Sequence, residues 1–312
     1  MNLILSVVVP LLNEDEIVEE LIKRLKISLD GVSENYEIIL VDDGSNDGTW
    51  EKISLISKID NRVKGIKLSR NFGHHYAISA GLHNAHGEWV VVMDGDLQDR
   101  PEVIPELFYK AKEGFDVVFV SRNKRPESIF YKILQKLFYV FLRRLSGIDF
   151  DSRQANFSIL NHKVVEAFKK FPEYSRFYGS TIKWLGFKRT FIEAEHGKRY
   201  SGKPSYTIKK RLNLALDIIL SFSDRPLKFA IGLGLALSGL SFLILIWILI
   251  GYMSWGFTVI GWPSIIASIF LSSGAILVVL GVIGIYLGRV FNEVKSRPLY
   301  LIDDSVNIEE IS

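Results

Sequence analysis

The stretch with the clearest chemical potential is an apolar run, residues 89–93, followed at once by Asp94, Asp96 and Gln98. A run that is apolar at every position is typical of a strand buried on both faces of a parallel sheet. Ligands of open α/β sheets bind beyond the carboxyl ends of the strands. Carboxylate and amide oxygens suit Mg²⁺ or Mn²⁺. We therefore predict a metal site in residues 94–99, the acidic motif; the alternative is an ordinary polar turn.

Charged residues follow two other predicted strands in the same way. Asp42 and Asp43 come directly after residues 37–41, and Arg122 follows residues 116–120. Because parallel strands end at one edge of their sheet, these side chains are expected to lie near the acidic motif. Carboxylates, a divalent cation and an arginine together suit a nucleotide diphosphate.

The elements that must position these residues alternate along the chain. Apolar runs and helical periodicity take turns with short connections, which predicts an α/β fold with a doubly wound, mostly parallel sheet. The predicted strands are residues 5–9, 37–41, 63–68, 89–93 and 116–120, with a further strand within 151–160, and helices follow the first three.

The composition indicates a second, uncharged region of the chain. No charged residue occurs from Phe229 to Gly288, which is long enough for two membrane spans, near 228–250 and 264–288. Lys and Arg flank the spans but are missing between them, so the positive-inside rule puts both termini in the cytoplasm. The net charge of +3 gives no nucleic-acid signature, and the absence of cysteine excludes thiolate sites and disulfides.

Two basic amphipathic stretches, about 128–146 and 206–222, are predicted to be helices in the membrane interface; an ordinary core-facing helix is the alternative. Between them, the loop 196–206 carries Arg199 and Lys203 four residues apart. This loop is predicted to hold a phosphate, or alternatively to be a solvated basic loop beside an anionic membrane.

With these residues assembled, the chain resembles family 2 glycosyltransferases, and most closely the polyprenyl-phosphate sugar transferases. The segments that carry the resemblance appear in order over nearly the whole chain. They are Val-Val-Pro-Leu-Leu-Asn-Glu (8–14), Val-Asp-Asp-Gly-Ser-Asn-Asp-Gly-Thr (41–49), Met-Asp-Gly-Asp-Leu-Gln-Asp-Arg-Pro-Glu (93–102) and Arg-Tyr-Ser-Gly-Lys-Pro-Ser-Tyr (199–206).

The resemblance implies a GT-A fold, a nucleotide sugar donor, a polyprenyl phosphate acceptor and a Mg²⁺ or Mn²⁺ ion. It implies metal binding by Asp94, Asp96 and Gln98, and catalytic roles for Asp96, Arg122 and Lys203. The residues implied in substrate binding are Pro10, Leu12, Glu14, Val41, Asp42, Asp43, Asp94, Gly95, Asp96, Gln98, Arg122, Arg199, Lys203 and Ser205.

Two positions depart from the family pattern. Position 12 is often aromatic in relatives but is Leu12 here, and many bacterial relatives have Asp where this chain has Asn156. The second loss is tolerable, since a phosphate monoester is already mostly anionic at pH 7 and needs little help from a general base. We expect one in-line displacement with inversion at the sugar carbon.

These expectations give a cytoplasmic glycosyltransferase domain over 1–225, a two-helix membrane domain over 226–290 and a cytoplasmic tail over 291–312. UDP-glucose is the expected donor. The alternatives are a processive polysaccharide synthase, which would need a Gln-x-x-Arg-Trp segment that is missing here, and a non-enzymatic membrane subunit. Small residues in both spans permit close helix packing, which leaves a homo-oligomer open.

Overall fold

The structure is a computed structural model of the chain, and the residues described are 3–122, 154–171, 177–194, 197, 225–255 and 261–308. The chain divides into two compact units, and each is described by itself. The α/β unit comprises residues 1–132, 151–205 and 298–312, and the two-helix unit comprises 133–150 and 206–297. The predicted interface helices, 128–146 and 206–222, lie outside the described residues.

The α/β unit is built on one sheet with the strand order β7-β5-β6-β4-β1-β2-β3-β8. The predicted parallel core is confirmed, because β1, β2, β3 and β4 are parallel neighbours and β5 pairs with β7 in parallel. Two strands, β6 and β8, are antiparallel to their neighbours. The strands are β1 (Leu5–Leu11), β2 (Tyr36–Asp42), β3 (Val63–Leu68), β4 (Trp89–Val92), β5 (Val117–Arg122), β6 (Gln154–Asn161), β7 (Arg189–Ala194) and β8 (Ile302–Val306).

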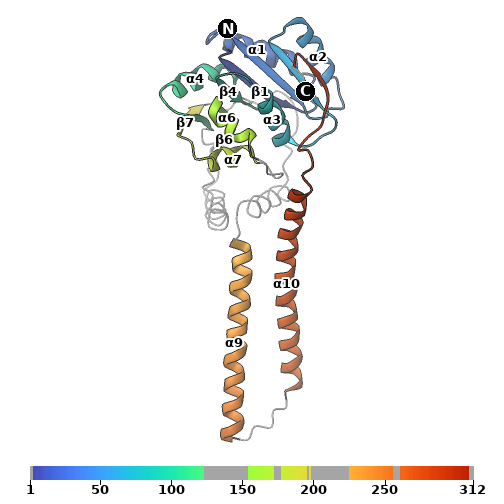
Figure 1. Cartoon of the computed structure of the whole chain (residues 1–312), viewed down its shortest axis with the longest axis vertical. Coiled ribbons are helices and arrows are strands. Elements are labelled where there is room, and N and C mark those ends of the chain that lie inside the picture. The colour runs from blue at the N-terminus through green and yellow to red at the C-terminus, as the bar shows by residue number, and fades with distance from the viewer. Residues whose placement is uncertain are drawn as a thin grey trace. The chain divides into compact units, whose positions relative to one another are not determined.

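Helices cover both faces of this sheet (Figure 1). The central strands are buried along their whole length, so side chains from both faces enter one of two hydrophobic clusters. The first cluster joins one face to α1 (Val18–Asp30), α2 (Thr49–Ile59) and α4 (Ile104–Lys112), the last preceded by the short 3₁₀ helix η1 (Pro101–Val103). The second cluster joins the other face to α3 (His74–His83), α6 (His162–Lys169) and α7 (Tyr178–Trp184).

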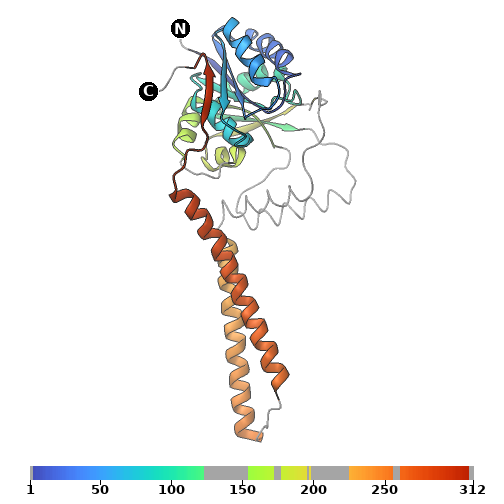
Figure 2. The same ribbon diagram turned by 90° about the vertical axis from the view of Figure 1, so that its right-hand side faces the viewer.

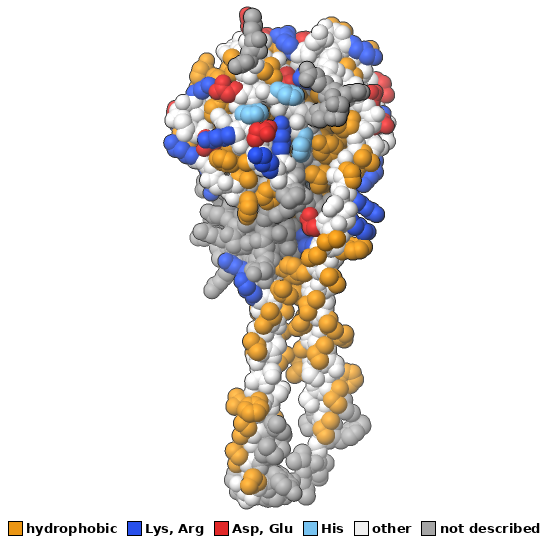
Figure 3. Space-filling model, viewed as in Figure 1, with side chains coloured by type: hydrophobic (Ala, Val, Ile, Leu, Met, Phe, Trp, Pro, Cys, Tyr) orange, Lys and Arg blue, Asp and Glu red, His pale blue; other side chains and the backbone are white. Residues whose placement is uncertain are grey.

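The two-helix unit contains α9 (Arg225–Trp255) and α10 (Trp262–Val294), which extend beyond the predicted spans at both ends. Both are long and apolar enough to cross a membrane, with mean hydropathies of 1.9 over 227–244 and 2.4 over 268–294. Figure 3 shows their hydrophobic side chains gathered along both helices, whereas charged side chains gather on the α/β unit.

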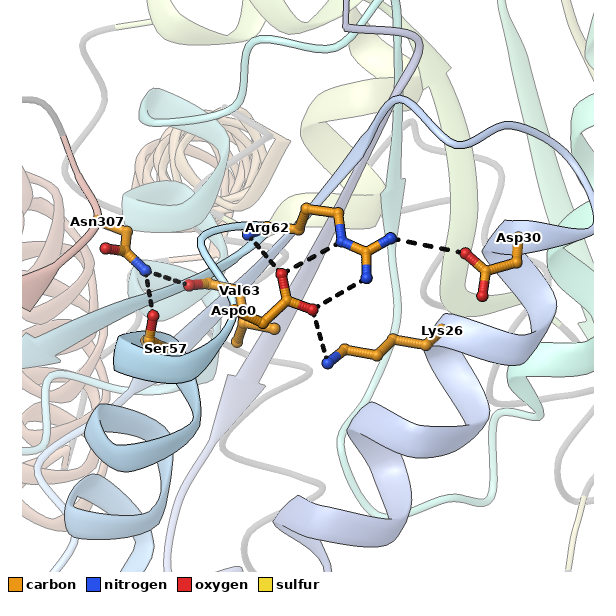
Figure 4. A network of polar contacts seen from close by, with 7 residues as sticks. All are labelled: Lys26, Asp30, Ser57, Asp60, Arg62, Val63 and Asn307. Carbon is orange, nitrogen blue, oxygen red and sulfur yellow. Dashed lines mark hydrogen bonds and ion pairs between the residues drawn. The ribbon is translucent and has the colours of Figure 1, made fainter.

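The chain after α10 was expected to be only a tail, but residues 302–306 form β8. This strand pairs with β3 at the edge of the sheet (Figure 2). Asn307 then donates from Nδ2 to the carbonyl oxygens of Ser57, at 2.5 Å, and Val63, at 2.9 Å (Figure 4). The C-terminal segment therefore belongs to the α/β unit.

Candidate active site

The acidic motif begins where β4 ends and packs directly on the end of β1. A β-carbon at Gly95 would lie 2.3 Å from Leu11 Cδ2 and 3.2 Å from the carbonyl oxygen of Pro10. The first distance is shorter than carbon atoms tolerate, so a side chain at position 95 would have to displace the end of the Leu11 side chain. Gly95 therefore sets the close approach of the acidic motif to the loop that follows β1.

The acidic motif is held in a compact turn by its own carboxylates. Asp96 Oδ1 accepts from the backbone nitrogen of Gln98 at 3.0 Å, and Asp99 Oδ2 accepts from the backbone nitrogen of Asp94 at 3.2 Å. Leu97 lies between them with φ 59° and a side chain that is only 3% exposed. A left-handed backbone at a residue other than glycine costs about 1–2 kcal/mol, which burial of the leucine side chain offsets.

Asp42 is the last residue of β2 and Asp43 follows it at the same edge, and both are buried. Asp42 Oδ1 accepts from the backbone nitrogen and the hydroxyl of Ser45. Asp43 accepts from the backbone nitrogens of Phe72 and Gly73 at 2.8–3.2 Å. Burial raises the pKa of both carboxyls above their ordinary value, against the effect of these hydrogen bonds.

Asn13 connects the loops that follow β1 and β2. Its backbone, with φ 55°, donates to Ser45 Oγ at 2.9 Å, while its side-chain Oδ1 accepts from the backbone nitrogen of Asn46 at 2.9 Å. The backbone nitrogen of Glu14 similarly donates to Thr49 Oγ1 at 2.9 Å. Hydrogen bonds therefore join the loop after β1 to the loop after β2, and both loops contain or adjoin residues implied in substrate binding.

The antiparallel strand β6 brings Asn156 to the acidic motif. The antiparallel register pairs Val92, the last residue of β4, with Ser158. Two residues after Val92 and two residues before Ser158, the same register places Asp94 opposite Asn156. His74, the first residue of α3, lies between them. Its Nε2 is 3.2 Å from Asp94 Oδ1 and 3.1 Å from Asn156 Nδ2.

The pKa values of the two neighbouring histidines are shifted in opposite directions. Burial alone would lower the pKa of His74, but the hydrogen bond to Asp94 and the nearby carboxylates of Asp43 and Asp99 raise it above its ordinary value. Burial lowers the pKa of His75 to about 3, and the charge on His74 adds to the effect. His75 is therefore neutral at physiological pH and stacks edge-on against Phe177 at 5.4 Å.

Four of the predicted substrate residues lie on β1 and β2 or in the loop after β1. Leu12 and Glu14 lie in the loop after β1, and the Leu12 side chain is 39% exposed. Pro10 and Val41 are buried within their strands, and the Val41 side chain belongs to a hydrophobic cluster. Substrate binding at Val41 stays a prediction.

Of the predicted phosphate-binding residues, only Arg122 lies among the described residues. Arg122 is the last residue of β5, on the same edge as the acidic motif, but β6 separates β5 from β4. Arg199, Lys203 and Ser205 lie outside the described residues. Gly197, near the start of their loop, is described. Its backbone nitrogen donates to the carbonyl oxygen of Gln98 at 2.9 Å, which places this residue next to the acidic motif. A β-carbon at Gly197 would be 3.0 Å from the carbonyl oxygen of Leu97.

Within the described ranges, no three His, Asp or Glu side chains converge as a ready-made metal site. The donor set of the acidic motif, two carboxylates and one amide, nevertheless has the chemistry for a hard cation that completes its shell with substrate phosphates. A metal at Asp94, Asp96 and Gln98 stays a prediction.

Comparison with known proteins identifies the family to which the chain belongs. The model of the family described as "Glycosyl transferase family 2" matches residues 6–169, which include all of β1 but its first residue, β2 to β4, the acidic motif, His74 and Asn156. The chain belongs to glycosyl transferase family 2. The resemblance predicted from the four sequence segments is confirmed.

Relatives align over nearly the full chain, including α9 and α10. An uncharacterized glycosyltransferase of Bacillus subtilis, YkcC, is 42% identical over 97% of this chain and 94% of its own. The bactoprenol glucosyl transferase of Shigella phage SfII is 34% identical over 96% and 98%. The undecaprenyl-phosphate 4-deoxy-4-formamido-L-arabinose transferase of Proteus mirabilis is 32% identical over 98% and 94%.

Solved structures confirm the GT-A type of fold. The mannosyltransferase PcManGT from Pyrobaculum calidifontis, solved with GDP-Man and Mn²⁺, has a TM-score of 0.50 at 18% identity over 71% of this chain and 64% of its own. The glucosyl-3-phosphoglycerate synthase from Mycobacterium tuberculosis, solved with Mn²⁺, UDP-glucose and phosphoglyceric acid, has a TM-score of 0.50 at 18% identity over 71% and 79%. These similarities concern the fold alone.

Several contacts of the site were not predicted from the sequence. The sequence analysis predicted no role for His74 and no hydrogen bonds from Asn13. One signal was present, since His74 opens the helix after β3 and therefore had to lie at the same edge as the other strand ends. The β6 register that brings Asn156 to His74 had no such signal.

Proposed function

We propose that this protein transfers a sugar from a nucleotide sugar, with UDP-glucose as donor, to undecaprenyl phosphate or a similar polyprenyl phosphate in a membrane. One observation carries the proposal: relatives that match almost all of this chain, both long apolar helices included, are named as bactoprenol and undecaprenyl-phosphate transferases. The carboxylate edge of the sheet supplies a site whose chemistry suits the donor.

In this proposal, the loops after β1 and β2 hold the nucleoside, cross-linked by Asn13 as described. Asp94, Asp96 and Gln98 hold Mg²⁺ or Mn²⁺, which supplies charge stabilisation for the departing diphosphate. Arg122, Arg199, Lys203 and Ser205 contact phosphate groups of donor or acceptor. The chain thus contributes orientation and electrostatics rather than a covalent intermediate.

The reaction we propose is one displacement. A phosphate oxygen of the acceptor attacks the anomeric carbon of the sugar, the bond from that carbon to the nucleoside diphosphate breaks, and the configuration inverts. The attacking phosphate is mostly dianionic at pH 7, so Asn156 in place of a carboxylate is compatible with turnover.

We also propose that the protein is an integral, two-span membrane protein with its α/β unit and both termini in the cytoplasm. The Lys and Arg residues that flank α9 and α10 support this orientation. The pairing of β8 with β3 supports an even number of crossings, because the chain that leaves α10 rejoins the sheet that precedes α9.

A donor panel tests the proposal. Full-length protein in detergent, undecaprenyl phosphate and Mn²⁺ are mixed with UDP-glucose, GDP-mannose and UDP-N-acetylhexosamines, and lipid-linked sugar is measured with and without a chelator. We expect transfer from UDP-glucose, loss of transfer with the chelator, and a product of inverted configuration. No transfer from any donor, or retention of configuration, would contradict the proposal.

A further inference from the structure

The chain that follows α10 has no role in the function proposed above. Its residues 300–307, the C-terminal segment, contain β8. The segment starts at the carboxyl end of β3, where Ile302 is paired with Leu68. It ends at the other end of β3, where Asn307 donates to the carbonyl oxygen of Val63. The first residues of the segment therefore lie at the edge of the sheet that carries the candidate active site.

These first residues contact the loop after β3, residues 69–73. The backbone nitrogen of Ser69 donates to the carbonyl oxygen of Leu301 at 2.9 Å, one residue beyond the last pair between β3 and β8. The neighbouring Tyr300 packs on the second hydrophobic cluster, and its ring centroid is 6.1 Å from that of His83 on α3. A buried contact thus fixes the C-terminal segment at the point where it meets the loop.

The same loop also contacts Asp43, one of the residues implied in substrate binding. The Asp43 carboxylate accepts from the backbone nitrogens of Phe72 and Gly73. The backbone of the loop also touches the next residue, Gly44, where a β-carbon would lie 2.4 Å from the carbonyl carbon of Arg70. The loop after β3 therefore lies between the C-terminal segment and the loop after β2 and contacts both.

The position of Asp43 depends on this loop. The hydrophobic core does not fix the first half of the loop, because Ser69, Arg70 and Asn71 are exposed. Asp43 is only 3% exposed, and a buried carboxylate that loses its hydrogen-bond donors is destabilised. If the loop moves away, the Asp43 carboxylate has to turn toward solvent. A segment that holds the loop in place therefore also holds Asp43.

We propose that the C-terminal segment is a positioning element for the nucleotide sugar donor, which holds the loop after β3 and, through it, the Asp43 carboxylate. The proposal rests on the proposed function and deepens it, because it adds to the donor site a segment outside residues 6–169, the part that the family model matches. The segment acts through the loop and does not itself touch the donor.

The test compares changes at the two ends of the C-terminal segment. Tyr300→Ala removes the packing next to the loop, and Ser69→Pro removes the backbone N–H that donates to Leu301. Ser69→Ala is the matched control for the hydrogen bond, because it keeps that N–H. Asn307→Ala is the control for stability, because it loosens the segment at the end remote from the loop.

All variants are made in the full-length protein in detergent. The dissociation constants of UDP and of GDP are measured by calorimetry with Mn²⁺, at a temperature well below the melting temperature of every variant. KM is measured separately for the sugar nucleotide and for undecaprenyl phosphate.

We expect the Kd of the nucleotide that the wild type binds more tightly to rise about three- to tenfold in Tyr300→Ala and Ser69→Pro, and the donor KM with it, which corresponds to about one lost hydrogen bond. The acceptor KM should stay within about twofold of wild type, as should all constants of the two controls. Asn307→Ala should nevertheless melt at a lower temperature, which separates positioning from stability. An unchanged nucleotide Kd in Tyr300→Ala or Ser69→Pro, or an equal rise in a control, would overturn the inference. If Tyr300→Ala does not fold, the comparison of Ser69→Pro with Ser69→Ala decides.

The calorimetry separates this inference from the proposed function. If the wild type transfers sugar but the variants bind nucleotide as the wild type does, only the inference fails. If the wild type transfers no sugar but binds nucleotide in a manner that depends on Tyr300 and on the Ser69 N–H, the inference stands and the proposed transfer fails. If the wild type binds no nucleotide, both fail.

Discussion

The packing of Gly95 on the end of β1 makes a quantitative prediction for Gly95→Ala. The added methyl would lie 2.3 Å from Leu11 Cδ2 and 3.3 Å from Val9 Cγ1, whereas carbon atoms pack at about 3.5–4.0 Å. Leu11 is 2% exposed, and its carbonyl oxygen accepts from the backbone nitrogen of Asp43 at 2.9 Å. It therefore has little room to yield.

Two responses are open to the substituted protein, and both are measurable. Overpacking of this kind costs about 1–3 kcal/mol, which for a unit of this size lowers the melting temperature by roughly 2–12 °C. If the acidic motif moves away instead, a displacement of about 1 Å reduces turnover on the order of a hundredfold. We expect a lower melting temperature, weaker sugar transfer, or both.

The assay is a thermal melt of the full-length protein in detergent, together with the transfer rate. Gly31→Ala is the matched control, because a β-carbon there meets nothing closer than 3.5 Å. Leu11→Ala in the Gly95→Ala background should recover about 1 kcal/mol or more relative to the sum of the single changes, since the methyl enters the vacated space. Wild-type melting and turnover in Gly95→Ala, or strict additivity in the double variant, would refute the packing argument.

Two further predictions concern the opposite side of the α/β unit (Figure 4). Asn307→Ala removes both hydrogen bonds that anchor the end of β8, so we expect about 1–2 kcal/mol lower stability and faster proteolysis after residue 297; equal proteolysis rates would contradict it. The hydrogen bond from Arg62, with a further one from Lys26, holds the pKa of Asp60 well below its usual range. A carboxyl group whose pKa is lowered in the folded protein stabilises the fold at pH values above its ordinary pKa near 4. This stabilisation is lost as the pH falls. Asp60→Asn should therefore cost about 1 kcal/mol at pH 7, discounted for the exposure of Arg62, and should flatten the acid dependence of the melting temperature below about pH 4; unchanged acid dependence would count against this network.

The sequence was sufficient for the parallel core and for the edge that carries the carboxylates. Buried strands such as β4 are apolar at every position, and their polar ends stand out. Alternation of strands and helices then fixes a common edge. The same reasoning predicted the two long apolar helices, although α9 and α10 run several residues past the predicted limits.

The sequence was insufficient where long-range pairing decides the structure. The strand β8 has the sequence Ile-Asp-Asp-Ser-Val, which contains two residues with low β-propensity and is stabilised by pairing with β3 rather than by its own pattern. The insertion of β6 between β4 and β5 likewise depends on the pairing of strands that are far apart in the sequence. For that reason the meeting of Asn156, His74 and Asp94 could not be read from spacing along the chain.

The central claim is that Asp96 and its neighbours bind a cation with the sugar diphosphate at the edge of the sheet. The most direct test is transfer of labelled sugar to undecaprenyl phosphate by Asp96→Ala beside the wild type, with Mn²⁺ titrated into metal-free protein. The account predicts metal-dependent transfer by the wild type and no measurable turnover by Asp96→Ala, which should still fold and co-purify with membranes. Undiminished transfer by Asp96→Ala, or wild-type transfer that ignores the metal, would contradict it.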